Sequence, residues 1–272
     1  MASDEELVGQ LEQVWASMAA LADVLDEEEW RLPTECPGWS VQDHLVHITG
    51  IEWMLLGRPA PEYELAAYPE HVKNDVGRAN ERFVDSRRSW AGPEALAEFL
   101  EVTADRLTQL RTFTADDFGA SSWTPVGPGT VRDLLPFRVF DSWVHEQDMR
   151  RAVGRPGDLQ GPVAEVALER LVGAMPFVVG KKVAPPDGTT VVFSRTAPLA
   201  GTTALAVAGG RARALDRAPA DPTVQILLDG ETFARLACGR LDPAATIASG
   251  AVHFHGDAQL GRRVVEEMNF LF

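Results

Sequence analysis

Two polar side chains of one predicted helix are spaced so that both can bind a single metal ion. Asp141 and His145 lie four residues apart in the segment from Thr130 to about Val153. Because helical residues turn by about 100° each, positions four apart share a face. Leu134 lies on the same side of the helix and indicates that this side faces the core in part. Burying a lone carboxylate or imidazole is costly, and a shared divalent cation would offset that cost.

An ion pair is the alternative for this helix. Asp141 can pair with His145 or with Arg138, and such pairs perturb buried titratable groups without any metal. The helix by itself leaves both interpretations open.

A second predicted helix adds two histidines, His44 and His47. It begins at Ser40, which forms with Asp43 the S-x-x-D capping pattern, and it extends to about Leu56. His44 lies within the apolar face and His47 at its edge, so periodicity does not choose between them. One of them, added to the first pair, would give three protein ligands and an open position, as in catalytic metal sites.

Helices in the first half of the chain must position these residues. Apolar residues recur there every three or four positions, and capping residues or prolines mark several helix starts. Residues 115–129, rich in Gly, Pro, Ser and Asp, predict a loop. The expected helices are 4–26, 40–56, 71–90, 93–113 and 130–153.

The sequence pattern changes after residue 154, from mainly helical to partly strand-like. Short runs rich in β-branched residues predict strands, and Gly209-Gly210 predicts a hairpin turn between two of them. The expected strands are 189–194, 203–207, 211–215, 224–228 and 251–255, with helices over 163–176, from Asp229 to Gly239, and over 257–270. The predicted fold class is therefore α+β with two domains, a helical bundle and a small α+β domain.

Composition narrows the possible partners and the compartment. The formal net charge of −15 repels phosphate backbones and anionic membranes, so we expect no nucleic-acid or membrane partner. Cys36 and Cys238 form no paired pattern, and the acidic N-terminus does not resemble a signal peptide. These features predict a cytoplasmic protein, and both a monomer and a homodimer remain possible.

Two segments carry a resemblance to a known family. Residues 36–47, C-P-G-W-S-V-Q-D-H-L-V-H, and residues 138–152, R-V-F-D-S-W-V-H-E-Q-D-M-R-R-A, resemble the signatures of the mycothiol-dependent maleylpyruvate isomerase family. Residues 224–240 and 250–257 are similar to sterol-carrier-type domains. The resemblance implies a DinB-like four-helix up-down bundle over 1–155, followed by a sterol-carrier-like α+β domain over 156–272.

The resemblance also implies a site. It favours His47 over His44 and makes His47, Asp141 and His145 the metal ligands. Two imidazoles and a carboxylate suit Zn²⁺, and Ni²⁺, Mn²⁺ or Fe²⁺ are compatible. In the family an arginine of the C-terminal domain takes part in catalysis. We assign that role to Arg240, whose alternative role is to interact with the C-terminal end of its helix.

The implied function is thiol chemistry on a small molecule. Mycothiol would ionise at the metal and attack an electrophilic carbon, so the partners are a low-molecular-weight thiol and a small electrophile. Addition to the cis double bond of a maleylpyruvate-type substrate, rotation and elimination would return the trans isomer. Two alternatives stand beside this isomerase. One is a mycothiol S-transferase acting on electrophiles in detoxification or biosynthesis, and the other is a non-catalytic module that binds a small molecule or lipid.

The remaining polar and thiol side chains receive structural predictions. Cys36 is predicted to be a structural thiol, because no sequence neighbour would activate it, and Cys238 a core residue. His253 and His255 are expected on an exposed strand face. Asp148 is expected either to orient His145 or to pair with an arginine, Arg151 or Arg138.

Overall fold

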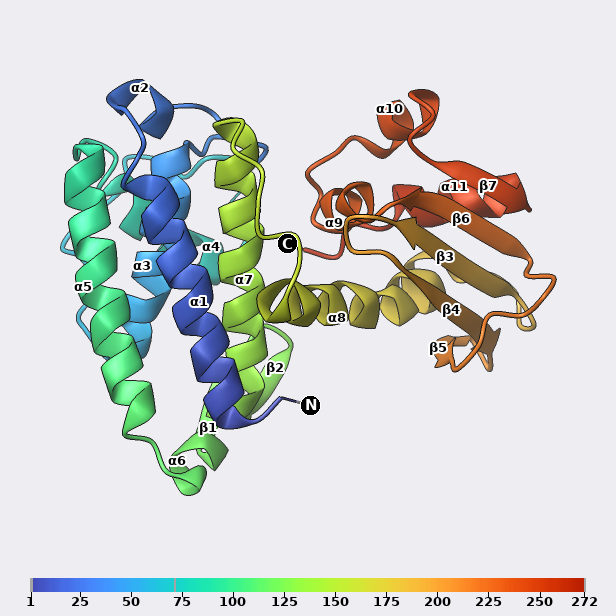
Figure 1. Cartoon of the computed structure of the whole chain (residues 1–272), viewed down its shortest axis with the longest axis horizontal. Coiled ribbons are helices and arrows are strands. Elements are labelled where there is room, and N and C mark those ends of the chain that lie inside the picture. The colour runs from blue at the N-terminus through green and yellow to red at the C-terminus, as the bar shows by residue number, and fades with distance from the viewer. Residues whose placement is uncertain (1, 71, 272) are drawn as a thin grey trace. The chain divides into compact units, whose positions relative to one another are not determined.

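The chain divides into two compact units, Met1–Asp158 and Leu159–Phe272. The computed structural model describes residues 2–70 and 72–271. Among these residues, the first unit contains helices and one hairpin, and the second combines a sheet with helices (Figure 1). The predicted fold class, a DinB-like bundle followed by an α+β domain, is confirmed. No helix among the described residues is long and apolar enough to cross a membrane.

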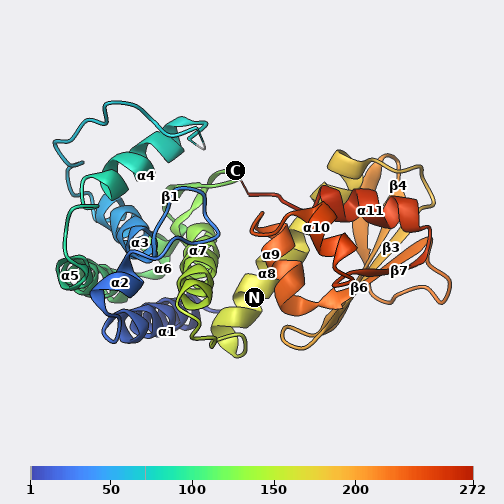
Figure 2. The same cartoon turned by 90° about the horizontal axis from the view of Figure 1, so that it is seen from above.

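Four long helices form the bundle, which Figure 2 shows from one end. Helix α1 packs against α5 and α7, and α3 packs against the same two helices. Helices α1 and α3 therefore lie diagonally across the bundle, and α3 and α7 are neighbours. The bounds are α1 Asp4–Ala22, α3 Val41–Leu55, α5 Gly92–Arg111 and α7 Val131–Ala152.

The shorter helix α4, Asp75–Asp85, packs closely on α3. Phe83 of α4 lies directly over Gly50 of α3, where an added Cβ would come within 2.7 Å of the phenyl Cδ1. The glycine thus allows the ring to contact the helix backbone. Phe83 is 5% exposed and belongs to a cluster with Val46, Val84 and Ala95.

Three local predictions in this unit were wrong. The helix expected over 4–26 ends at Ala22, because Asp26 caps a separate helix, α2, over Glu27–Trp30. Residues 115–129 contain a helix and a hairpin in place of a loop. The helix over 71–90 is shorter than expected, because Asn74 caps its start, and residue 71 lies outside the described residues. The elements in the expected loop are α6 Ala115–Gly119, β1 Ser121–Thr124 and β2 Gly127–Thr130.

The second unit contains a mixed sheet of strand order β5-β4-β3-β6-β7. Strands β3 and β6 are parallel, and the other neighbours are antiparallel. Each predicted strand occurs within a few residues of its expected range. The bounds are β3 Thr190–Thr196, β4 Gly201–Ala208, β5 Arg211–Leu215, β6 Val224–Asp229 and β7 His253–Gly256.

Helices accompany the sheet within this unit. They are α8 Pro162–Phe177, the π-helix η1 Val178–Val183, α9 Gly230–Ala237, α10 Pro243–Ala248 and α11 Ala258–Glu266. Helix α10 was not predicted.

The two edge strands of the sheet present polar side chains to solvent. On β5, Arg211 and Arg213 are exposed, and Ala212 between them is buried. On β7, His253 and His255 are exposed, as predicted.

Candidate metal centre

Capping residues fix where the two site helices begin. The Asp43 carboxylate accepts a hydrogen bond from the Ser40 backbone N–H at 2.8 Å, at the start of α3. At the start of α7, Asp133 accepts from the Thr130 N–H at 2.9 Å and returns its own N–H to the Thr130 hydroxyl. These reciprocal bonds satisfy N–H groups that have no partner within the helix. They set the first turn of each helix and so help to determine which residues face the neighbouring helix.

The three predicted ligands lie together between α3 and α7. His47 Nε2 is 3.3 Å from one Asp141 oxygen, and His145 Nε2 is 3.6 Å from the other. One potential ligand atom from each residue lies within 4.8 Å of the others. Donors about 2.0–2.1 Å from a tetrahedral metal are about 3.3 Å apart. The spacing therefore fits one ion after small side-chain adjustments.

Exposure differs between the donors. The side chains of His47 and His145 are 6% and 10% exposed, whereas that of Asp141 is 32% exposed. His47 Nδ1 is also buried and has no hydrogen-bond partner among the described residues. An unpartnered buried nitrogen calls for a partner such as a water molecule, because an ion shared with Asp141 would bind at Nε2. The histidines are thus desolvated, while the carboxylate side of the cluster is open to solvent.

A chain of buried charges holds Asp141 in place. Arg138 donates from Nη1 to Asp141 at 2.6 Å and from Nε to Glu52 at 2.7 Å. Arg106 donates to the second Glu52 oxygen at 3.3 Å. The Arg138–Asp141 ion pair, the alternative to a metal, is therefore present. Because this pair leaves both histidines beside the carboxylate, it does not displace the candidate ligands.

The surroundings of Asp141 and His47 shift the pKa of both groups below their usual values. Burial lowers the pKa of His47 more than Asp141 raises it. Burial raises the pKa of Asp141, but the charge of Arg138 and the hydrogen bonds from His145 and His47 outweigh it and hold that pKa well below its usual range. Asp141 is therefore a carboxylate at neutral pH, and the His47 imidazole tends to be neutral. Both are the protonation states that bind a cation.

A second group of side chains lies on the other side of His145. His44 Nδ1 is 2.7 Å from His145 Nδ1, and an Asp148 oxygen is 3.5 Å from the same nitrogen. The Cys36 thiol donates to that oxygen at 3.6 Å. Burial lowers the pKa of His145, but hydrogen bonds to Asp141, Asp148 and Cys36 raise it well above its usual value. The sequence indicated Asp148 as a partner of His145, but the positions of Cys36 and His44 depend on contacts that it does not reveal.

Trp39 covers the three imidazoles. Its ring centroid lies 5.4, 5.1 and 5.8 Å from those of His44, His47 and His145. The indole N–H donates to Glu81 at 3.1 Å, and the ring packs against the cluster around Phe83. Trp39 is therefore partly buried against the core and forms a wall of the site.

Arg240, the predicted catalytic arginine, belongs to the second unit. It follows α9 after Gly239, whose φ of 69° ends the helix, and its guanidinium donates to the Cys238 carbonyl at 2.9 Å. This contact matches the alternative role near the helix end, and the catalytic role remains a prediction. Cys238 itself is 4% exposed, in agreement with the predicted core position.

Comparison with known proteins identifies the family. Residues 11–150 match the model of the mycothiol maleylpyruvate isomerase N-terminal domain, and residues 178–268 match that of the SCP-2 sterol transfer family. The chain belongs to the mycothiol-dependent maleylpyruvate isomerase family. A comparison with curated protein sequences found no match.

Two solved structures of that family have the same fold. A crystal structure of the mycothiol-dependent maleylpyruvate isomerase is 16% identical, covers 93% of each chain and has a TM-score of 0.60. A crystal structure of a histidine-to-alanine mutant of the mycothiol-dependent maleylpyruvate isomerase is 15% identical, with the same coverage and a TM-score of 0.57. At these identities the likeness shows the fold alone.

Proposed function

We propose that this protein is a metal-dependent enzyme that activates a low-molecular-weight thiol, mycothiol, for attack on an electrophilic carbon. The observation that carries the proposal is the convergence of His47, Asp141 and His145, with separations of 3.3 and 3.6 Å across Asp141. Three protein ligands leave an open position for an exogenous group, which distinguishes a catalytic from a structural site. The family match supports the choice of thiol.

Each residue of the cluster has a role in this proposal. His47 and His145 would offer Nε2, and Asp141 a carboxylate oxygen. A bound divalent cation, for which this donor set favours Zn²⁺, supplies a Lewis acid that keeps a thiol ionised near neutral pH. Arg138 orients Asp141, and Trp39 excludes water from one side of the imidazoles. The partly exposed Asp141 marks the side from which thiol and substrate would enter.

The reaction on the substrate follows from thiolate chemistry. With a cis-alkene such as maleylpyruvate, addition of the thiolate gives a single bond that rotates, and elimination returns the thiol and the trans isomer. With an alkylating electrophile, the same attack gives a stable thioether. We propose Arg240 as the group that holds a substrate carboxylate, since a guanidinium matches two carboxylate oxygens.

The proposal is tested with His47→Ala. We expect the variant to lose thiol-dependent turnover at saturating Zn²⁺, because the site loses one of its three ligands, and to keep its helix content, measured by circular dichroism. His253→Ala, which removes an exposed histidine of β7, is the matched control and should keep both. Full thiol-dependent activity in His47→Ala would overturn the proposal.

Two substrates separate the isomerase from the S-transferase. Turnover of maleylpyruvate with mycothiol would identify an isomerase, and thioether formation with a bimane electrophile alone would identify a transferase. A metal-free purified protein that carries lipid would favour the non-catalytic alternative. Arg240→Ala should raise KM for a carboxylate substrate and leave the metal content unchanged.

A further inference from the structure

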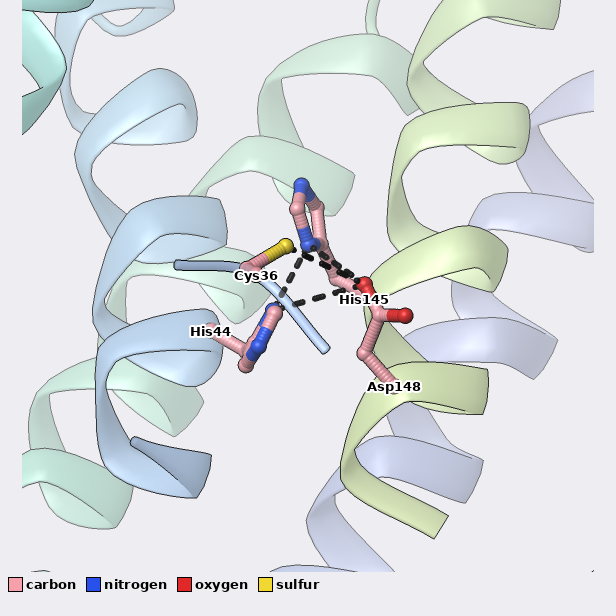
Figure 3. Close-up of side chains that lie close together, drawn as sticks. All are labelled: Cys36, His44, His145 and Asp148. Carbon is pink, nitrogen blue, oxygen red and sulfur yellow. Dashed lines mark hydrogen bonds and ion pairs between the residues drawn. The ribbon is translucent and has the colours of Figure 1, made fainter. Parts of the chain in front are cut away.

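The four side chains in Figure 3 converge on one point beside His145. They are Cys36, from the loop before α3, His44 of α3, and His145 and Asp148 of α7. One ligand atom from each lies within 4.8 Å of the others. The set contains a thiol, two imidazoles and a carboxylate, and it approaches His145 from the side opposite to Asp141.

The distances in this set approach those of a tetrahedral metal site. Donors about 2.0–2.3 Å from a metal are separated by about 3.3–3.7 Å. From the shared Asp148 oxygen, the separations are 3.6 Å to Cys36 Sγ, 3.8 Å to His44 Nδ1 and 3.5 Å to His145 Nδ1. The two histidine nitrogens, at 2.7 Å, now share a proton and would move apart slightly around an ion.

Hydrogen bonds orient His44 with a lone pair toward this point. The Thr34 hydroxyl donates to the Trp39 carbonyl at 3.1 Å and lies 2.7 Å from His44 Nε2. Because that hydroxyl proton is already used, Nε2 is the donor to Thr34, and Nδ1 of His44 is the acceptor. His145 must then be the donor in the His44–His145 contact, through Nδ1–H.

Asp148 is held in place from the other side. Arg151 donates to its second oxygen at 2.6 Å and to Glu35 at 2.9 Å. Asp148 and His44 have no exposed side-chain surface, and His145 is 10% exposed. Hydrogen-bonded partners that fix the orientation of donors are typical of metal sites.

We propose that Cys36, His44, His145 and Asp148 form a second metal position, which takes a thiophilic divalent cation such as Zn²⁺ or Cd²⁺. The Cys36 thiol proton is released to solvent when sulfur binds the metal. His145 binds through Nδ1 and releases the proton of that nitrogen to solvent, while Nε2 keeps its own proton and faces Asp141 at 3.6 Å. A thiolate donor makes this position softer than the set of His47, Asp141 and His145.

The two metal positions exclude each other. A neutral imidazole has one lone pair, so His145 serves either the first position through Nε2 or the second through Nδ1. The second position has four protein ligands and no open site. Relying here on the proposed function, we infer that a thiophilic ion in the second position holds the enzyme in an inactive form.

Cd²⁺ titration of the metal-free, full-length protein tests the proposal. One equivalent should bind and give the ultraviolet charge-transfer band of a cadmium–thiolate bond. Cys36→Ser should lose the band and bind Cd²⁺ at least about tenfold more weakly. Cys238→Ser, the matched control, should keep the band. Absence of the band in the unsubstituted protein, or its survival in Cys36→Ser, would overturn the proposal.

A second measurement covers a Cys36→Ser variant that fails to fold. The ¹¹³Cd NMR signal of the unsubstituted protein should lie in the range of one thiolate with nitrogen and oxygen ligands, and a shift typical of nitrogen and oxygen ligands alone would contradict the site.

The variant His47→Ala should lose turnover but keep the charge-transfer band. Failure of the proposed function is thereby distinguished from failure of this inference. Simultaneous binding of two equivalents would refute the exclusion.

Discussion

Glu52 lies between two buried arginines and connects the candidate metal centre to α5. Its oxygens accept from Arg138 at 2.7 Å and from Arg106 at 3.3 Å, and the side chain is 1% exposed. Removing one partner of a buried ion pair leaves an uncompensated buried charge. The resulting loss of stability is larger than the net stabilisation that the intact pair provides. Glu52 is therefore important both for the fold and for the position of Asp141.

Glu52→Ala should strongly destabilise the protein. We expect a loss of about 3–5 kcal/mol in the free energy of unfolding, because Arg106 would remain buried without its carboxylate and Arg138 would keep only Asp141. Urea denaturation measures the loss. Glu101→Ala removes a 66% exposed partner of Arg58 and should change stability by less than about 1 kcal/mol. Equal effects in the two variants would contradict the assignment.

Glu146 predicts a pH dependence of stability. It is buried in α7, beside Ser17 and Arg150, and burial raises its pKa from 4.5 to about 7, because the opposing effects of Ser17 and Arg150 are smaller. Between pH 4.5 and about 7, Glu146 therefore keeps its proton in the folded protein and loses it in the unfolded chain. The contribution of this group to stability is present below about pH 4.5 and falls as pH rises to about 7.

Glu146→Gln should remove this slope. The amide oxygen can still accept from Ser17 and Arg150, but the side chain no longer titrates. We expect the variant to exceed the unsubstituted protein in stability by up to about 3 kcal/mol at pH 8, measured by urea denaturation across pH 5–8. Glu12→Gln, at a 51% exposed position of α1, should leave the slope unchanged. Parallel pH curves for all three proteins would refute the prediction.

At the scale of elements, the approach of α4 to α3 depends on Gly50. Gly50→Ala should destabilise the protein by about 1–3 kcal/mol, because the new methyl group would meet Cδ1, Cγ and Cβ of Phe83 at 2.7, 2.8 and 3.3 Å. Gly9→Ala in α1 is the control, since nothing lies within 4 Å of an added Cβ there. That variant should gain about 0.5–1 kcal/mol from helix propensity. Thermal unfolding of both variants measures the difference, and a neutral Gly50→Ala would contradict the packing.

The starts of the site helices could be predicted from the sequence, because their determinants are local. Ser40 and Thr130 each lie three residues before an aspartate that closes the capping box. The hairpin over 121–130 could not be, because its Gly and Pro content is typical of loops and its pairing depends on packing against α7.

The candidate site was only partly predictable for the same reason. Helical spacing brings Asp141 and His145 together, but the choice of His47 rested on a family resemblance. The structure gives each α3 histidine its own partner, since His47 faces Asp141 and His44 faces His145. The contact between Cys36 and Asp148 joins residues 112 positions apart, and no local pattern reports such a contact.

At the scale of the whole molecule, metal binding should change hydrogen exchange in the first unit only. All donors of both candidate positions lie in residues 36–148, within the first unit. Adding one equivalent of Zn²⁺ should therefore slow hydrogen exchange in α3 and α7 and leave peptides from β3 to β7 unchanged, because binding stabilises the elements that supply the ligands. Hydrogen-exchange mass spectrometry measures this. Equal protection in the sheet would contradict the assignment of the metal to the bundle.

The arginines of β5 affect how neighbouring molecules meet. An edge strand has unpaired backbone N–H and C=O groups that can pair with a strand of another molecule. In natural proteins, charged side chains on edge strands disfavour such pairing. Arg211 and Arg213 project to solvent from β5, while Ala212 between them faces the interior. Two molecules that approached edge to edge would bring four guanidinium groups together. The sheet can thus remain open at this edge without becoming a template for aggregation.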